Sequence, residues 1–184
     1  MDRCFILVSG LPGSGKSTLA QRLASVLGLP LLDKDTILER LFESVGTGDS
    51  AWRRKLSRES DQILQSQVTA SLGAVLVSHW HLPGMPPNSG TPTSWLLQLS
   101  AKVVNVHCEC EADLAAERFI RRQRHQGHLD SERSHSEIRA TIRAAALLGR
   151  LNVGPRVDVD TSLEPDLAVL NQIRKALENP YTDR

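Results

Sequence analysis

The chain has 184 residues, a mass of 20.3 kDa and 40% hydrophobic residues, which suits one globular domain with a core of ordinary size. Its 22 lysines and arginines are balanced by 21 aspartates and glutamates, which leaves a formal net charge of +1. That balance excludes a nucleic-acid or membrane surface that is basic over the whole molecule. We therefore predict a single domain over residues 1–184, in which any basic site is local.

The sequence carries no pattern typical of a targeting or membrane segment. Residues 1–8, MDRCFILV, form too short an apolar run for a signal peptide, and no stretch approaches the roughly 18 apolar residues of a membrane span. Three cysteines, an odd number, argue against a disulfide framework. We expect a cytoplasmic protein, monomeric or homodimeric, with no membrane partner, and we do not expect nucleic acid as a partner.

Apolar runs alternate with amphipathic stretches along the chain, a pattern typical of a parallel sheet covered by helices. The apolar runs predict strands at residues 4–8, 31–35, 74–78, 102–108 and 156–161. Apolar spacings of three and four predict helices at residues 16–27, 36–45, 53–72 and 111–124, a further helix opened by the capping box SHSE at 134–137, and a last helix from Pro165. Gly28 and Gly73 are predicted to end the first and third helices. Residues 83–94, rich in proline and glycine, predict an exposed loop.

The segment SGLPGSGKST, residues 9–18, matches the spacing G-x-x-x-x-G-K-[ST] between a predicted strand and a predicted helix. Glycines let the backbone curl around a phosphate chain, and the following helix directs its free N–H groups and positive dipole end at the anion. Lys16 is predicted to reach the β- and γ-phosphates, and the Ser17 hydroxyl to hold Mg²⁺. The predicted nucleotide-binding residues of this phosphate loop are Gly10, Gly13, Ser14, Gly15, Lys16, Ser17 and Thr18.

Features that mark other nucleotide-binding classes are missing from the sequence. It has no N-K-x-D for guanine and no L-S-G-G-Q, and its third predicted strand ends in Ser78-His79 instead of an acid. Two carboxylates, Asp33 and Asp35, instead follow the second apolar run about 20 residues after the phosphate loop. The pattern therefore predicts nucleotide binding without a GTPase, ABC or motor-type signature.

The segments GLPGSGKSTLAQRLA, LLDKDTILERLF, VHCECEADLAAERF, RHQGHLD and VDVDTS resemble, in order, those of small P-loop kinases of the nucleoside-monophosphate-kinase-like class. Closest are bacterial predicted kinases called "AAA family ATPase"; gluconate kinase, shikimate kinase, chloramphenicol phosphotransferase and polynucleotide 5′-hydroxyl kinases are similar. The resemblance implies a three-layer α/β/α P-loop NTPase fold, a five-stranded parallel sheet in the order 2-3-1-4-5 and a helical lid around residues 118–135. It further implies transfer of the γ-phosphoryl group of ATP, with Mg²⁺, to a hydroxyl of a metabolite or antibiotic.

The resemblance also implies roles for individual side chains. Asp35 would orient the acceptor hydroxyl and take its proton, and Asp33 would assist through the acceptor or a metal-bound water. Either aspartate could instead cap the helix that follows. On the lid, Arg118 would stack on adenine and Arg122 would neutralise phosphate charge. Arg121 and Arg124 are reserve candidates, and we place Arg124 among the acceptor-binding residues.

The chain departs from its relatives where the third strand usually ends in an acid. His79 is predicted to replace that acid as an acceptor contact, with an ordinary loop position as the alternative. Without the acid, the protein could be a nucleotide-binding regulator or slow ATPase, and a nucleic acid 5′-hydroxyl kinase is a second rival. Arg54 and Arg58 could grip an anionic acceptor, although a solvated helix face is the better interpretation.

Overall fold

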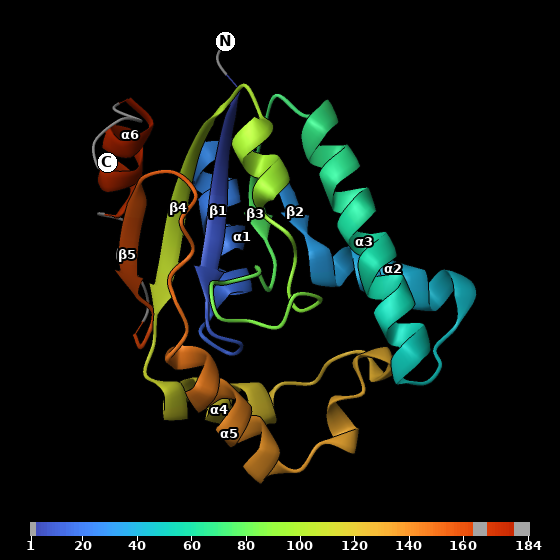
Figure 1. Cartoon of the computed structure of the whole chain (residues 1–184). Helices are drawn as coiled ribbons and strands as arrows, with labels where there is room; N and C mark the ends of the chain where they lie inside the picture. The colour runs from blue at the N-terminus through green and yellow to red at the C-terminus, as the bar shows by residue number, and fades with distance from the viewer. Residues whose placement is uncertain (1–2, 164–168, 179–184) are drawn as a thin grey trace.

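The computed structural model describes residues 3–163 and 169–178, and its centre is a parallel five-stranded sheet (Figure 1). The strands are β1 (Cys4–Gly10), β2 (Leu31–Asp33), β3 (Gly73–Val77), β4 (Lys102–Glu109) and β5 (Arg156–Asp160). Their order across the sheet is β2-β3-β1-β4-β5, which confirms the predicted order. Because β1 is central, the loop that follows it opens at the middle of the carboxyl edge of the sheet.

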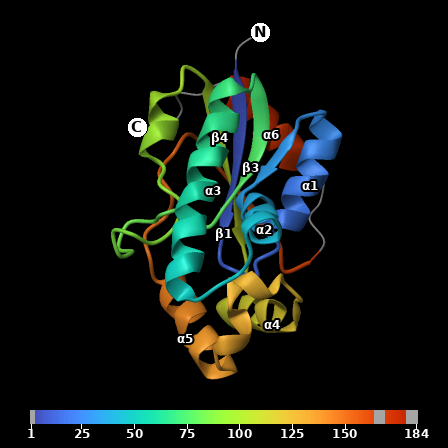
Figure 2. The ribbon, with the colours of Figure 1, turned by 90° about the vertical axis from the view of Figure 1, so that its right-hand side faces the viewer.

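Helices cover both faces of the sheet and its carboxyl edge. They are α1 (Lys16–Leu27), α2 (Lys34–Val45), α3 (Ser50–Ala70), α4 (Ala112–Arg121), α5 (His135–Ala146) and α6 (Val169–Glu178). Figure 2 shows the sheet between α3 on one side and α1 and α6 on the other, with α4 and α5 beyond the strand ends. The three layers are thus as predicted. In the stretch predicted as the lid, around residues 118–135, α4 ends at Arg121 and is followed by two short 3-10 turns, Gln126–His128 and Asp130–Glu132.

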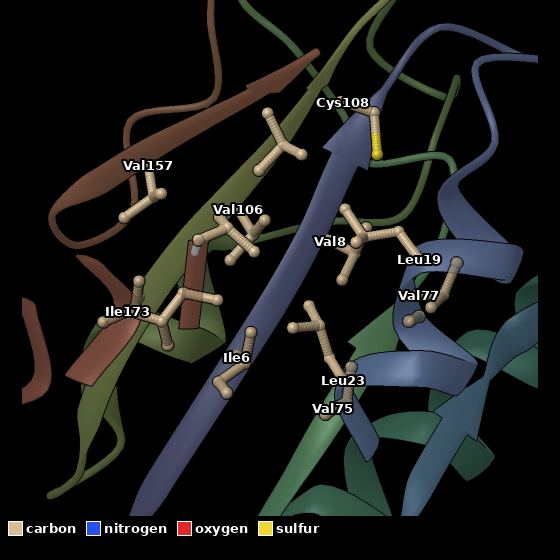
Figure 3. Close-up of a cluster of buried hydrophobic side chains, with 14 of the residues drawn as sticks. Ile6, Val8, Leu19, Leu23, Val75, Val77, Val106, Cys108, Val157 and Ile173 are labelled. Carbon is tan, nitrogen blue, oxygen red and sulfur yellow. The ribbon is translucent and has the colours of Figure 1, made fainter. Parts of the chain in front are cut away.

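Alternation along the strands divides the core between the two faces. Ile6 and Val8 of β1 pack with Leu19 and Leu23 of α1 and with Ile173 of α6 (Figure 3). The intervening residues Phe5 and Leu7 pack against α3 instead. The four side chains at residues 5–8 of β1 are fully buried. This explains why the sequence of the strand is an uninterrupted apolar run, as is typical of strands covered on both faces.

Several predicted boundaries are wrong by two or three residues. The second helix begins at Lys34, since the Asp33 side chain caps it, so Asp35 lies in the first helical turn and not at a strand end. The third helix spans Ser50–Ala70, and Gly73 begins β3 instead of ending that helix. The fourth helix stops at Arg121, so Arg122 and Arg124 lie beyond it.

Other boundary predictions are confirmed. Gly28 ends α1 in the left-handed conformation, with φ of 64°, and Ser134 with Glu137 forms the capping box of α5. Pro165, predicted to begin the last helix, lies outside the described residues. No helix within residues 3–163 and 169–178 is long and apolar enough to cross a membrane.

The loop predicted as exposed between β3 and β4 is partly buried. Thr91 is only 1% exposed, and its backbone N–H donates to the carbonyl oxygen of His79 at 2.7 Å. Trp80 is 2% exposed and donates its indole N–H to the carbonyl oxygen of Val8 at 2.9 Å. The loop is therefore fastened to the end of β1, directly before the phosphate loop, by contacts that a composition rich in proline and glycine does not reveal.

Candidate active site

The phosphate loop, residues 10–17, joins β1 to α1 with glycines where the backbone needs them. Gly13 has φ of 83°, and a Cβ on it would lie 2.0 Å from the carbonyl oxygen of Ala115 in α4. Gly10 has φ of 137°, and a Cβ there would lie 2.8 Å from the carbonyl oxygen of Cys108. These two glycines therefore let the loop lie directly against α4 and β4, in addition to leaving its N–H groups free to face an anion.

The side chain of Lys16 is folded back onto this loop. Its Nζ donates to the carbonyl oxygens of Gly10 at 3.0 Å and Leu11 at 2.7 Å. Burial, assisted by the charge of Arg122 and opposed by Cys108, Asp35 and Asp33, lowers the pKa of Lys16 from 10.5 to about 8. An ammonium held by two carbonyl oxygens in a buried position can exchange them for phosphate oxygens, which are stronger partners.

Asp33 links the phosphate loop to the start of α2. Its Oδ1 accepts a hydrogen bond from the backbone N–H of Asp35 at 2.9 Å, and its Oδ2 accepts one from Ser17 Oγ at 3.1 Å. Burial and the neighbouring charge of Asp35 raise the pKa of Asp33. The capping interpretation is therefore right for Asp33, and the same carboxylate also fixes the hydroxyl predicted to hold Mg²⁺.

The chemistry of this corner fits a magnesium ion shared with a nucleotide. Ser17 and Asp33 offer a hydroxyl and a carboxylate, the oxygen ligands that Mg²⁺ prefers. Within the described part of the chain, no group of three or more His, Cys, Asp or Glu side chains is placed to hold a metal ion. The ion would therefore take most of its other ligands from phosphate oxygens and water.

Asp35 faces the arginines of the lid. Its Oδ2 accepts a hydrogen bond from Arg124 at 2.5 Å, and the other guanidinium nitrogen of Arg124 donates to Asp130 at 3.0 Å. Burial opposes ionisation of Asp35, but the charge and the hydrogen bond of Arg124 outweigh it and lower the pKa of Asp35. The carboxylate is thus ionised at neutral pH, which suits an acceptor of hydrogen bonds.

Aromatic and polar contacts hold the lid, around residues 118–135, against α2. The Phe42 ring stacks on His125 with 5.3 Å between centroids and meets His128 edge-on at 5.6 Å. His128 Nε2 lies 2.9 Å from Glu39 Oε1. A Cβ on Gly127 would lie 2.6 Å from the Phe42 ring, so only glycine fits there. The lid is therefore closed over the carboxylate pair.

The two lid arginines assigned to the nucleotide lie in different surroundings. Arg118 donates to the carbonyl oxygens of Thr161 at 2.7 Å and Ser162 at 2.8 Å, joining α4 to the segment after β5. Arg122 follows the end of α4, with its guanidinium 4.1 Å from the Phe119 ring centroid, and burial lowers its pKa to about 10. The helix predicted at residues 111–124 would carry both arginines, but α4 ends between them at Arg121, so Arg122 lies outside the helix.

His79 lies near the same centre. Burial, assisted by the charges of Lys16 and Lys34 and opposed by Asp35, lowers its pKa to about 4. The imidazole is therefore neutral at physiological pH. The structure brings together Lys16, Asp33, Asp35, Arg122 and Arg124, with His79 beside them, while Arg118 lies toward the end of β5.

The sequence prediction missed a buried network between the two aspartates and β3. Lys34 Nζ lies 2.6 Å from Asp61 Oδ1 of α3, which also accepts a hydrogen bond from Thr91 Oγ1 at 2.7 Å. Thr91 Oγ1 in turn lies 2.5 Å from the Ser78 hydroxyl at the end of β3. A carboxylate from α3 therefore reaches the strand end that lacks its own acid, and the four residues join α2, α3 and the loop after β3.

Arg53 was also missed, although the sequence contains a signal for it. It lies three and seven residues before Leu56 and Ser60, so it falls on the buried stripe of α3, whereas Arg54 and Arg58 are exposed as expected. Its Nε is buried without a hydrogen-bond partner. Burial and the charge of Arg124 lower the pKa of Arg53, with Asp130 and Asp35 opposing them. The solvated face preferred for Arg54 and Arg58 is thus confirmed, and the buried arginine of this helix is Arg53.

A phosphate loop between β1 and α1, the sheet order β2-β3-β1-β4-β5 and a lid closing over α2 define the class: a P-loop fold of the small-kinase type. The chain belongs to the family described as "AAA domain", whose model matches residues 5–146. This confirms the family that the sequence motifs predict.

Among curated proteins, a shikimate kinase from Corynebacterium jeikeium (strain K411) is 39% identical over 70 residues, which are 35% of this chain and 38% of that protein. The chain spans less than half of the first curated relatives it matches, at 24%, 17%, 38% and 44% of their lengths. These similarities therefore concern part of each relative only.

Solved structures match over nearly the whole chain. The structure described as "putative kinase from chloroflexus aurantiacus j-10-fl" has a TM-score of 0.80 and 25% identity, covering 96% of this chain and 99% of that chain. A shikimate kinase from Bacteroides thetaiotaomicron has a TM-score of 0.58 and 18% identity, covering 95% and 98%. The second likeness concerns the fold alone, which is the predicted P-loop kinase fold.

Proposed function

We propose that the protein transfers the γ-phosphoryl group of ATP, with Mg²⁺, to a hydroxyl group of a small molecule. One observation carries this proposal: Asp33 accepts hydrogen bonds both from Ser17 of the phosphate loop and from the backbone of Asp35. The carboxylate that would aim an alcohol is thereby set at a fixed place beside the loop that would hold the triphosphate. The family and the kinase names of its relatives support the same reaction.

The side chains of the site divide the work of phosphoryl transfer. Lys16 would leave the carbonyl oxygens of Gly10 and Leu11 and bind the β- and γ-phosphates, while Arg122 neutralises charge that spreads over the transferred group. Bound Mg²⁺ supplies further charge neutralisation at the phosphate oxygens. Asp35, ionised because of Arg124, would orient the acceptor hydroxyl in line with the γ-phosphorus and take its proton as the new bond forms.

Closure of the lid serves this chemistry by excluding water. Phe42, His125 and His128 place aromatic rings between α2 and the lid. Water that reached the γ-phosphorus would compete with the acceptor and hydrolyse ATP. We propose that Arg118 stays on the carbonyl groups after β5 and borders the adenine site from there, with Gly10, Gly13, Ser14, Gly15 and Thr18 completing the nucleotide site and His79 contacting the acceptor.

The first test removes the ammonium of Lys16 and the carboxylate of Asp35 in two separate variants. Lys16→Ala is expected to abolish ATP binding and transfer, because the triphosphate loses its buried cation. Asp35→Asn is expected to lower transfer by roughly a thousandfold while ATP affinity stays within about threefold, because the amide cannot take a proton. Transfer from γ-labelled ATP to a panel of hydroxylated metabolites and antibiotics measures activity, and calorimetry measures ATP affinity. Tight ATP binding without any transfer would favour a nucleotide-binding regulator instead.

The acceptor is further proposed to carry an oxyanion of its own. Both donor ends of Arg124 are occupied by carboxylates, and Arg122 is assigned to the triphosphate, so Arg53 is left with a buried Nε that has no partner. A buried N–H without a hydrogen bond costs about 1–3 kcal/mol, which a carboxylate or phosphate on the acceptor would recover. We therefore propose a hydroxy acid or a phosphorylated alcohol as the acceptor, in preference to a strongly cationic antibiotic.

The test compares alcohols that differ only in charge. Transfer to a hydroxy acid or sugar phosphate is expected, with its uncharged methyl ester or parent sugar at least roughly tenfold poorer. Arg53→Met is expected to raise the KM of the anionic acceptor by roughly a hundredfold with little change for ATP. Arg54→Met is the matched control, since Arg54 is exposed and donates only to Ser50. Equal use of neutral and anionic alcohols would disprove the oxyanion requirement.

A further inference from the structure

A cavity of about 480 Å³ lies beside the phosphate loop, apart from the aspartates and arginines of the proposed site. Its walls come from Ser9–Pro12, from the segment after β3, from the end of β4 and from the end of α5; Lys16, Asp33, Asp35 and Arg53 do not line it. The volume lies within the range of small-molecule sites. Among the residues with a role in the proposed kinase function, only Gly10 and His79 line the cavity, and that function assigns no ligand to the rest of its volume.

The inner wall of the cavity is apolar. Trp80, Leu151 and Cys108 are between 1% and 5% exposed, and Leu11 and Leu148 add partly buried surface. Burial raises the pKa of the Cys108 thiol to about 12, so it is an uncharged, weakly polar part of this wall. A ligand would therefore present an apolar body to the inside.

One hydrogen-bond acceptor is fixed in that wall. Asn105 donates its amide N–H to Leu151, so its Oδ1 is the atom that accepts the hydroxyl proton of Ser9, at 2.7 Å. Ser9 Oγ has then spent its only proton, so His107 Nδ1, at 3.0 Å, must carry a proton and donate it. Burial lowers the pKa of His107 to about 4, so the ring is neutral and its Nε2 is an acceptor.

The rim of the cavity is acidic. Glu109, Glu111 and Asp160 line it and are exposed, whereas Arg150 is the single cationic lining residue among those described. Glu111 and Asp160 each hold backbone N–H groups with one carboxylate oxygen, and Arg156 approaches Glu109 to 3.8 Å. The charge is opposite to that of the arginines around Asp35, so the cavity and the proposed acceptor site suit different groups.

We propose that this cavity is a second binding site, which takes a small amphipathic amine. Its apolar body packs against Trp80 and Leu151, its N–H groups donate toward His107 Nε2, and its positive charge lies at the acidic rim. The site adjoins the proposed nucleotide and acceptor sites through Gly10 and His79 but takes a different ligand, and it stands whether or not transfer is found.

Occupancy of the cavity is coupled to the nucleotide through the phosphate loop. Gly10 and Leu11 line the cavity, and their carbonyl oxygens are the ones that hold Lys16 Nζ. A triphosphate that draws Lys16 away changes the same backbone segment that a bound amine contacts. Because such coupling is reciprocal, Mg²⁺-ATP changes amine affinity by the factor by which the amine changes ATP affinity.

The test uses three probes with one ring and different charge: 2-phenylethylamine, 2-phenylethanol and phenylacetate. Calorimetry on the full chain is expected to give an amine Kd at least roughly tenfold below those of the alcohol and the acid. Mg²⁺-ATP is expected to shift the amine Kd by roughly threefold or more. Equal affinity for the three probes, or no binding of the amine, overturns the site; an unchanged amine Kd overturns the coupling.

Matched variants locate the binding. Ala145→Trp fills the cavity and is expected to weaken amine binding by at least roughly tenfold, while Ala144→Trp, on an exposed neighbour that does not line it, leaves the Kd unchanged. If Ala145→Trp fails to fold, the double variant Glu109→Gln with Asp160→Asn replaces it and is expected to remove the preference for the amine. Undiminished amine binding in both variants overturns the proposal.

Discussion

Lys16 shows, at the scale of one residue, how a binding group costs stability. Its side chain is half-buried against the phosphate loop, and this burial lowers its pKa from 10.5 to about 8. The unfolded chain therefore binds a proton at this group more tightly than the folded one does. The motif predicted where Lys16 lies, but the carbonyl partners that hold it in the free protein follow from loop geometry that residue spacing does not encode.

Lys16→Met is predicted to be more stable than the parent protein at about pH 7. A difference of about 2.5 pKa units corresponds to at most about 3 kcal/mol, from which the two lost hydrogen bonds subtract. Because the folded pKa is lowered, the penalty is complete below about pH 8 and fades as pH rises toward 10.5. Urea unfolding at several pH values checks this, and a stability difference independent of pH would contradict it.

Asp33 and Asp35 show that the separate roles of two nearby residues of the same type are difficult to predict from sequence. The sequence predicted both as site residues and left open which of them caps the helix. The structure assigns the cap to Asp33 and the contact with Arg124 to Asp35. This division depends on where α2 begins, because the residue directly before the first helical turn is the one that caps the helix. Roles within such a pair are therefore beyond what spacing alone predicts.

At the scale of elements, Lys34 and Asp61 join α2 to α3. Their side chains are only 9% and 19% exposed, so the pair is largely desolvated. Lys34→Met leaves the Asp61 carboxylate buried without its cation and is predicted to cost about 3 kcal/mol in the free energy of unfolding.

Arg58→Met, an exposed cation on α3, is the control and is expected to change stability by less than about 0.5 kcal/mol. Urea unfolding of both variants decides the matter. A cost below about 1 kcal/mol for Lys34→Met would mean that the pair contributes no more than a surface salt bridge.

The packing of the lid on α2 depends on the absence of a side chain at Gly127. A side chain there would lie within 2.8 Å of three atoms of the Phe42 ring. Gly127→Val is predicted to lift the lid from α2, because the ring is packed and cannot give way without losing its stacking on His125. Hydrogen exchange of residues 122–133 is expected to rise by roughly tenfold or more, with the core strands unchanged. Gln126→Val, one residue away, is the control; unaltered exchange in the Gly127 variant would refute the prediction.

Element identity was predictable, and element ends were not. Each apolar run and each amphipathic stretch forms the predicted strand or helix where the structure describes it. The starts of α2 and α3 moved because caps at Asp33 and Asp49 set them, and a capping side chain is recognised only with its backbone partner. The end of α4 moved because the backbone is already extended at Arg122. For α4 the error mattered, since it placed Arg122 on a helix face that does not exist.

At the scale of the whole molecule, the sheet order and layers follow from the family resemblance, and the strand pairing agrees with it. The single domain over residues 1–184 stays a prediction. Three features could not be predicted: the acceptor site, the buried network of Lys34 and Asp61, and the cavity beside the phosphate loop. Each forms where segments distant in sequence meet, such as α3 with the loop after β3. A sequence motif describes residues on one segment, so it does not predict contacts between distant segments.

The close fit of Gly13 to the carbonyl of Ala115 limits how the molecule can open. The first turns of α4 are pinned between the phosphate loop and α5, with Ala115, Ala116 and Phe119 buried. Any opening of the lid must therefore take place about a hinge that follows Phe119, near the end of α4. ADP could leave and ATP could enter while the phosphate loop keeps its conformation. Each catalytic cycle would then begin with a nucleotide site that is already formed.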